Sequence, residues 1–117
     1  MRNFLIFWFP VLAYSAIIFG VSSLPGDSIS LPWNLDKLAH CIEYMLLSVL
    51  AFRALAGTTK LSRGQVLILV VLGVTAYGIS DEFHQMFVPG RDASWLDVLA
   101  DGAGGIMGAY LSIIFRK

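Results

Sequence analysis

Acidic side chains and a histidine recur at helical spacing along the chain. Asp36, His40 and Glu43 are spaced i, i+4 and i+7, which places all three on one face of a helix. The same four-residue step separates two further pairs of polar residues, Asp81 with Gln85 and Asp97 with Asp101. Carboxylates and imidazoles act as general bases and as ligands for divalent metals, so these positions are candidates for catalysis or binding.

Three kinds of chemistry fit these residue types. The side chains could bind a divalent metal, although neither an H-E-x-x-H motif nor a cysteine-based spacing is present. A histidine held by a carboxylate could act as a general base, although no nucleophile is marked out. A third use is binding a polar or phosphorylated headgroup, with Arg91 as the contact to the anion. The sequence leaves the cofactor and the metal unknown, and a polar network that only fixes helix register is the competing explanation.

Hydrophobic segments must position these side chains. Phe4 to Leu24 is 21 residues long without a charge, which exceeds the apolar core of about 7–15 residues in a cleaved signal peptide. Three later segments are also long and apolar, and about 20 residues of helix cross a bilayer core. The sequence therefore predicts one all-α domain over residues 1–117, an integral membrane four-helix bundle with helices at about 4–24, 37–55, 64–81 and 95–115.

The composition agrees with a membrane protein and excludes other classes. Hydrophobic residues make up 57% of the 117 residues and charged residues 14%, against about 25% in a soluble domain. Eight acids balance eight bases, so the basic excess of a nucleic-acid-binding protein is missing. The single cysteine, Cys41, excludes an internal disulfide framework and a cysteine-based zinc site.

The charges are distributed unequally over the predicted spans. Four spans place both termini and the 53–64 connection on one side, with six of the eight bases: Arg2, Arg53, Lys60, Arg63, Arg116 and Lys117. The positive-inside rule then predicts cytoplasmic termini in a multi-pass protein of the cell (inner) membrane. All eight acids and both histidines fall in the outer half. Glu43 and Asp101 lie inside predicted helices, so they are expected to face the bundle interior. Their expected partners there are Arg91, Lys37 or a histidine.

Local signals also predict packing and capping. Gly104 and Gly108 form a G-x-x-x-G pair, which favours close contact with another helix of the same bundle. Ser94 followed by Asp97 fits a helix N-cap with an acid at N3, as in a capping box. Asp27, Asp92 and Glu82, taken alone, fit solvated loop positions.

The polar segments resemble the motifs of a known family. Residues 36–44, DKLAHCIEY, resemble the D-K-x-x-H-x-x-x-Y motif of VanZ-like membrane proteins. Residues 81–91, DEFHQMFVPGR, resemble the second motif of that family, D-E-x-x-Q-x-F-x-P-G-R. Residues 94–105 continue the likeness, with Asp97 at the later acidic position. The family often has asparagine where this chain has Asp101. The resemblance spans about residues 4–115.

The resemblance implies a role in the cell envelope, because the family takes its name from a protein linked to low-level resistance to the glycopeptide teicoplanin. It carries over these site candidates: Asp36, His40, Tyr44, Asp81, Glu82, Gln85, Pro89, Gly90, Arg91 and Asp97. Residue types and spacing add Glu43 and Asp101. The leading hypothesis is a VanZ-like protein whose outward-facing polar pocket binds a lipid-linked envelope precursor or a glycopeptide antibiotic. The alternatives are a metal-assisted hydrolase or transferase acting on a lipid headgroup, or a structural or assembly protein. A homo-oligomer is compatible with the sequence.

Overall fold

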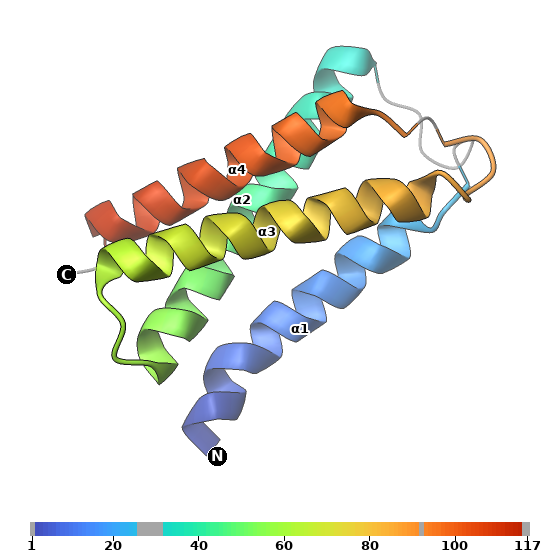
Figure 1. The fold of residues 1–117 in the computed structure, drawn as a ribbon. Coiled ribbons are helices and arrows are strands. Elements are labelled where there is room, and N and C mark those ends of the chain that lie inside the picture. The colour runs from blue at the N-terminus through green and yellow to red at the C-terminus, as the bar shows by residue number, and fades with distance from the viewer. Residues whose placement is uncertain (1, 26–31, 92, 116–117) are drawn as a thin grey trace.

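The computed structural model describes residues 2–25, 32–91 and 93–115, without the side chains of residues 33 and 34. It contains four α-helices (Figure 1): α1 (Arg2–Ser22), α2 (Trp33–Thr58), α3 (Arg63–Gln85) and α4 (Trp95–Phe115). No strand occurs in these described ranges. All four helices are long and apolar enough to cross a membrane. The predicted all-α class with four membrane-spanning helices is therefore confirmed.

Two of the helices extend beyond their predicted ends. α2 begins at Trp33 and ends at Thr58, and α3 continues to Gln85 instead of ending near residue 81. Because the last turn of α3 is rich in polar residues, the sequence predicts a loop there. Asp81, Glu82 and Gln85 are nonetheless buried, so the solvated loop position predicted for Glu82 is wrong. Their polar side chains form an inward face of the helix, so the polar stretch does not mark a loop.

The start of α3 is fixed by a capping box that the sequence reading missed. The Ser62 hydroxyl accepts the Gln65 backbone N–H at 3.2 Å, and the Gln65 side-chain oxygen accepts the Ser62 N–H at 3.0 Å. This reciprocal pair satisfies two backbone donors at the helix start. The Ser-x-x-Gln pattern at 62–65 was the available signal.

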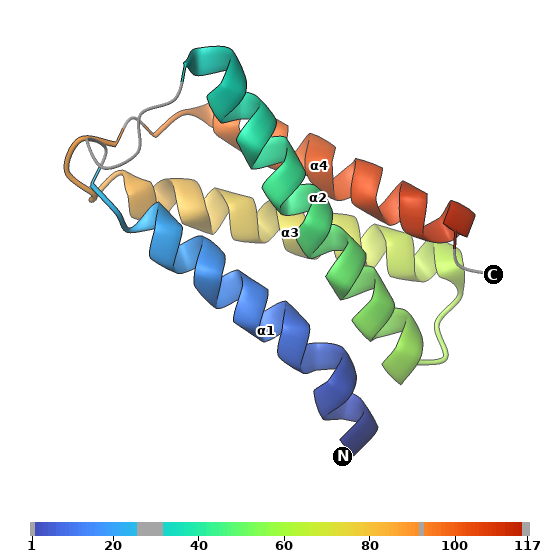
Figure 2. The same cartoon turned by 180° about the vertical axis from the view of Figure 1, so that it is seen from behind.

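The two ends of the bundle differ in what they carry. Ser22, Trp33, Gln85 and Trp95 lie at one end, which we call the connection end (Figures 1 and 2). Arg2, the α2–α3 connection and Phe115 lie at the other, which we call the termini end. α2 contacts the other three helices, and α1 packs mainly on α2. This up-and-down arrangement is the one that four consecutive membrane spans require.

The contact between α2 and α4 depends on glycine. A Cβ atom at Gly104 would overlap the backbone carbonyl oxygen of Cys41, and one at Gly108 would overlap that of Met45. Close approach also lets the Ser48 hydroxyl donate to the Gly105 carbonyl at 2.6 Å. The G-x-x-x-G pair thus brings two helices of one chain together, which confirms the predicted internal packing.

Large apolar side chains cover the outside of the helices. Phe9 and Leu12 on α1 are 66% and 67% exposed in the isolated chain. Leu72 on α3 and Leu99 on α4 are also exposed. Apolar surface of this extent suits contact with lipid chains, whereas in water it would favour association.

Candidate functional site

Polar side chains from α2, α3 and α4 meet inside the connection end. We call this group the polar cluster: Asp36, Lys37, His40, Glu43, Tyr44, Asp81, Glu82, Gln85, Asp97 and Asp101. Seven of its members are buried: His40, Tyr44, Asp81, Glu82, Gln85, Asp97 and Asp101. The structure therefore brings together residues up to about sixty positions apart in the sequence, as the bonds described below show.

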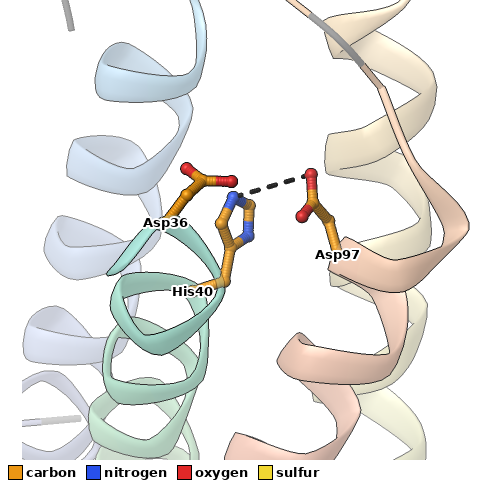
Figure 3. Close-up of side chains that lie close together, drawn as sticks. All are labelled: Asp36, His40 and Asp97. Carbon is orange, nitrogen blue, oxygen red and sulfur yellow. Dashed lines mark ion pairs between the residues drawn. The ribbon is translucent and has the colours of Figure 1, made fainter. Parts of the chain in front are cut away.

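His40 lies between two carboxylates of α4. Its Nδ1 atom is 2.8 Å from Oδ1 of Asp101, and its Nε2 atom is 3.9 Å from Oδ2 of Asp97. Figure 3 shows the imidazole between Asp97 and Asp36, which lies one turn earlier on α2. The hydrogen bond to Asp101 orients the ring, as general bases and metal ligands require, and leaves the second nitrogen facing Asp97.

Lys37 supplies positive charge on the outer side of His40. Its ammonium group contacts Oδ1 of Asp97, and it lies 3.5 Å from Oδ2 of Asp36. The Asp97 side chain is almost fully buried, whereas the Lys37 side chain remains partly exposed. Asp97 is thereby paired with a lysine as well as facing the histidine.

Tyr44 connects α2 to the acidic end of α3. Its hydroxyl donates to Oδ2 of Asp81 at 3.0 Å, and the Tyr44 side chain has no exposed surface. A buried carboxylate needs donors of this kind, because an unpaired one is costly. The Tyr44–Asp81 bond thus holds one buried acid in place without neutralising its charge.

Glu82 is held by the backbone at the start of α4. Its Oε2 atom accepts the Ser94 N–H at 2.9 Å, while the Ser94 hydroxyl accepts the Leu96 N–H at 3.1 Å. Ser94 therefore caps α4, but the predicted capping box with Asp97 is wrong. The Ser94 N–H is already bonded to Glu82, and the Asp97 carboxylate turns to Lys37.

Two carboxylate oxygens of the cluster have no described hydrogen-bond partner. They are Oε1 of Glu82 and Oδ2 of Asp101, both buried. Most buried polar atoms in proteins are paired, so each of these orphan oxygens calls for an explanation. One oxygen of each carboxylate is anchored and the other is left over.

Gly78 makes room for Asp101, which the sequence reading missed. A Cβ at Gly78 would lie 3.0 Å from both Cβ and Oδ2 of Asp101. Glycine inside a helix costs about 1 kcal/mol relative to alanine, so its presence one turn before Asp81 signals a close approach.

Arg91 binds the end of α1. Its Nε atom donates to the Leu24 carbonyl at 2.9 Å, and its Nη2 atom donates to the Val21 carbonyl at 2.7 Å. The Val21 carbonyl also accepts the Leu24 backbone N–H at 3.2 Å, so Arg91 adds a second bond at the point where α1 ends. The described hydrogen bonds of Arg91 therefore serve α1, where the sequence suggested a contact to an anionic ligand.

A small cavity opens between α1, α2 and α3 beside the cluster. Its volume is about 110 Å³. Its lining includes Asp36, His40, Glu43, Asp81, Gln85 and Arg91. Six of the predicted site residues thus share one cavity wall, whereas Tyr44, Asp97 and Asp101 do not line it. Glu82 lines a separate cavity of about 350 Å³ together with Ser94.

The remaining candidates lie outside this cavity. His84 stacks on Phe19 with ring centroids 4.6 Å apart, and its Nε2 lies 2.9 Å from the Ser23 hydroxyl. Pro89 and Gly90 are exposed in the connection that leads to Arg91. Gly90 has φ 76°, which favours glycine and explains this residue without a ligand. Asp27 and Asp92 lie outside the described residues.

The cluster contains two overlapping sets of possible metal ligands. In each set, one donor atom per residue lies within 4.8 Å of the others. One set is Asp36, His40 and Asp97, and the other is His40, Glu82 and Asp101. His40 belongs to both, so it is the centre of any metal chemistry at this end.

Long apolar helices around a buried polar cluster define a multi-pass helical membrane protein. A family model described as VanZ/LLP1 matches residues 3–116, nearly the whole chain, and the chain belongs to this family. The resemblance drawn from the two motifs is thereby confirmed. No curated protein and no solved structure matches the chain.

Proposed function

We propose that this VanZ-like membrane protein binds a positively charged group of an envelope-related ligand in the polar cavity. The observation that supports this is the composition of the cavity wall. Three carboxylates, those of Asp36, Glu43 and Asp81, line it beside His40. The one arginine in the wall, Arg91, donates hydrogen bonds to α1. A cation is therefore the group that this wall would attract.

The charge of the whole connection end supports the same ligand class. Six acids of the cluster face two basic side chains, Lys37 and Arg91, and one histidine. Even with His40 charged, fully ionised acids would leave a negative excess. Such an excess is costly where lipid and packed helices exclude water. A bound cation would reduce that cost.

The size of the cavity limits what it could enclose. The cavity volume of about 110 Å³ is small for a site that would enclose a whole ligand. Pockets for whole drug-sized ligands are several times larger, at about 300–1,000 Å³. We therefore propose that a single ammonium-sized group enters. The rest of a glycopeptide or a lipid-linked precursor would stay at the membrane surface.

The orientation of the chain decides whether the cavity meets envelope ligands. In the sequence, six of eight bases lie close to the two termini or between residues 53 and 64, so the positive-inside rule supports cytoplasmic termini and an outward-facing connection end in the cell membrane. Reporter fusions in the 25–37 and 53–64 connections test this. Activity of a periplasmic or extracellular reporter is expected at 25–37 alone, and the reverse pattern would contradict the proposal.

A sensitivity assay tests the ligand proposal and the role in glycopeptide resistance. The wild-type chain is expressed in a teicoplanin-sensitive host beside Glu43→Gln and Asp81→Asn, with membrane levels matched. Both variants are expected to lose the tolerance that the wild type confers. The control is His84→Ala, which alters a histidine outside the cavity. Wild-type tolerance in both cavity variants would contradict ligand binding there. A wild type that confers no tolerance would contradict the resistance role.

A membrane enzyme acting on a lipid headgroup is the second candidate. The observation that favours it is the 2.8 Å contact between His40 and Asp101, which holds the imidazole as a general base requires. Purified wild type would then release a water-soluble headgroup from phospholipid vesicles, and His40→Ala would not. Equal release by both proteins would contradict this candidate.

A further inference from the structure

We infer that His40, Glu82 and Asp101 bind one divalent transition-metal ion, with Zn²⁺ as the best-suited probe. The three residues come from α2, α3 and α4, so a metal here would join three helices. This inference goes beyond the proposed ligand, because two of the three metal ligands, Glu82 and Asp101, do not line the cavity that would receive it. It can be tested without any envelope ligand.

The positions of the donor atoms support the inference. One atom from each residue lies within 4.8 Å of the others. Zinc binds histidine nitrogen and carboxylate oxygen at about 2.0–2.2 Å, so its ligands lie about 3–3.5 Å apart. Small side-chain movements would therefore close the set around an ion. Cys41 lies outside this set, and the site needs no thiolate.

The two orphan oxygens are the independent observation that points to a cation. Glu82 is 6% exposed and Asp101 is fully buried, and each has one oxygen without a partner in the described part of the chain. The other oxygen of Glu82 is anchored by the Ser94 N–H, and the other oxygen of Asp101 contacts His40, which belongs to the same set. A bond from a group outside the set, such as the one from Ser94, orients the ligands of known metal sites. A metal ion would give the unpaired oxygen of each carboxylate a partner.

Charge distinguishes this set from the overlapping one. In the set of Asp36, His40 and Asp97, the Lys37 ammonium already contacts both carboxylates. The described ion pairs give Asp101 only His40, and give Glu82 none. A dication balances two carboxylates and a neutral imidazole without remainder. An added cation is therefore expected to be stabilised more by the set of His40, Glu82 and Asp101 than by the overlapping set.

The experiment measures metal binding by purified, detergent-solubilised protein after removal of metals with a chelator. Zn²⁺ titration followed by dialysis and elemental analysis is expected to give about one ion per wild-type chain. Loss of an outer partner of a metal ligand costs about 10–100-fold in affinity, so loss of a ligand should cost at least about 100-fold. Glu82→Gln and Asp101→Asn keep the side-chain shape and should both show this loss. Helix content by circular dichroism verifies that they fold.

Matched histidine variants make the test specific. His40→Ala is expected to lose Zn²⁺ binding, whereas His84→Ala keeps it because His84 lies against Phe19 and Ser23. Co²⁺ added to the stripped wild type should give visible absorption bands that are missing in His40→Ala. Wild-type affinity in folded Glu82→Gln and Asp101→Asn would overturn the inference. So would a wild type that binds Zn²⁺, Co²⁺ and Mn²⁺ no more tightly than His40→Ala.

Discussion

The interior side chains at the two ends of the bundle are buried to similar degrees, but those at one end are apolar and those at the other end include acids. Towards the termini end the interior contains Phe52, Val66 and Val70, which are 1–4% exposed. At the connection end Asp97 and Asp101 are 2% and 0% exposed. The interior at one end is thus mainly apolar, whereas the interior at the other contains buried acids. Buried acids are costly in a membrane protein, which favours a functional explanation for them.

The polar groups at the two ends differ in kind. Near the termini end the Trp8 indole N–H donates to the Thr58 hydroxyl at 3.1 Å, and that hydroxyl donates to the carbonyl of Ala54. At the connection end Tyr44 bonds Asp81, and His40 contacts Asp101, across separate helices. Both ends therefore contain bonds between helices, but those at the connection end fix the relative positions of several buried ionisable groups. Fixed positions are what a binding site requires.

The largest expected effect is at the termini end, in the apolar core. Phe52→Ala removes a buried ring, which costs about 3–5 kcal/mol in soluble proteins. Lipid is as apolar as the core, so we expect the lower part of that range, about 3 kcal/mol. Reversible unfolding in mixed micelles measures the loss. A change below about 1 kcal/mol would contradict tight packing there.

The second-largest effect is expected for Gly104→Ala, which disturbs the contact between α2 and α4. Its Cβ would overlap the Cys41 carbonyl, so the helices must separate, at a cost of about 1–3 kcal/mol. Gly73→Ala is the matched control, because a Cβ there meets nothing within 4 Å. The same unfolding assay compares the two variants. Equal stability of both would mean that α2 and α4 are not in close contact.

Tyr44→Phe tests how much the hydrogen bond to the buried acid Asp81 stabilises the connection end. It removes the 3.0 Å bond to Asp81 and leaves a buried carboxylate short of a donor, which costs about 1–3 kcal/mol. The double variant Tyr44→Phe with Asp81→Asn should recover part of the loss, because the uncompensated charge is gone. A double variant as unstable as the sum of the two single variants would show that the residues are not coupled.

The smallest expected effect is at the cap of α3. Ser62→Ala removes the bond to the Gln65 N–H and should cost about 1 kcal/mol. Because Ser62 lies at the termini end, teicoplanin tolerance at matched membrane levels should not change. A loss of tolerance would mean that the two ends are not functionally distinct.

The four spans were predictable because their length and apolar character depend only on the local sequence. The last turn of α3 was not, since Asp81 and Gln85 resemble loop residues until the helices that bury them are known. Spacing placed Asp36 and His40 on one helix face, but it gave neither the rotation nor the depth of α4. The pairing of Lys37 with Asp97 and of His40 with Asp101 depends on both.

Arg91 shows that the residue type alone does not predict which groups a side chain will bond. A guanidinium among acids suggests an ion pair or a contact to an anion, yet the described bonds go to the Val21 and Leu24 carbonyls. These carbonyls are accessible to Arg91 because α1 ends there. The sequence does not show which backbone carbonyls will be accessible. The glycines of α3 show the same limit, since a Cβ at Gly78 would meet Asp101 whereas a Cβ at Gly73 would meet nothing within 4 Å.

One paired measurement tests most directly whether the buried acids serve binding and not folding. Asp81→Asn and Phe52→Ala are compared for both unfolding free energy and teicoplanin tolerance at matched membrane levels. The amide introduced by Asp81→Asn would still accept the Tyr44 hydrogen bond, and the substitution removes a buried charge. The stability of this variant should therefore stay within about 1 kcal/mol of wild type while tolerance is lost. Phe52→Ala should lose stability, and its folded fraction should keep tolerance. An Asp81→Asn protein that unfolds as easily as Phe52→Ala, yet confers full tolerance when folded, would contradict a binding role for the acids.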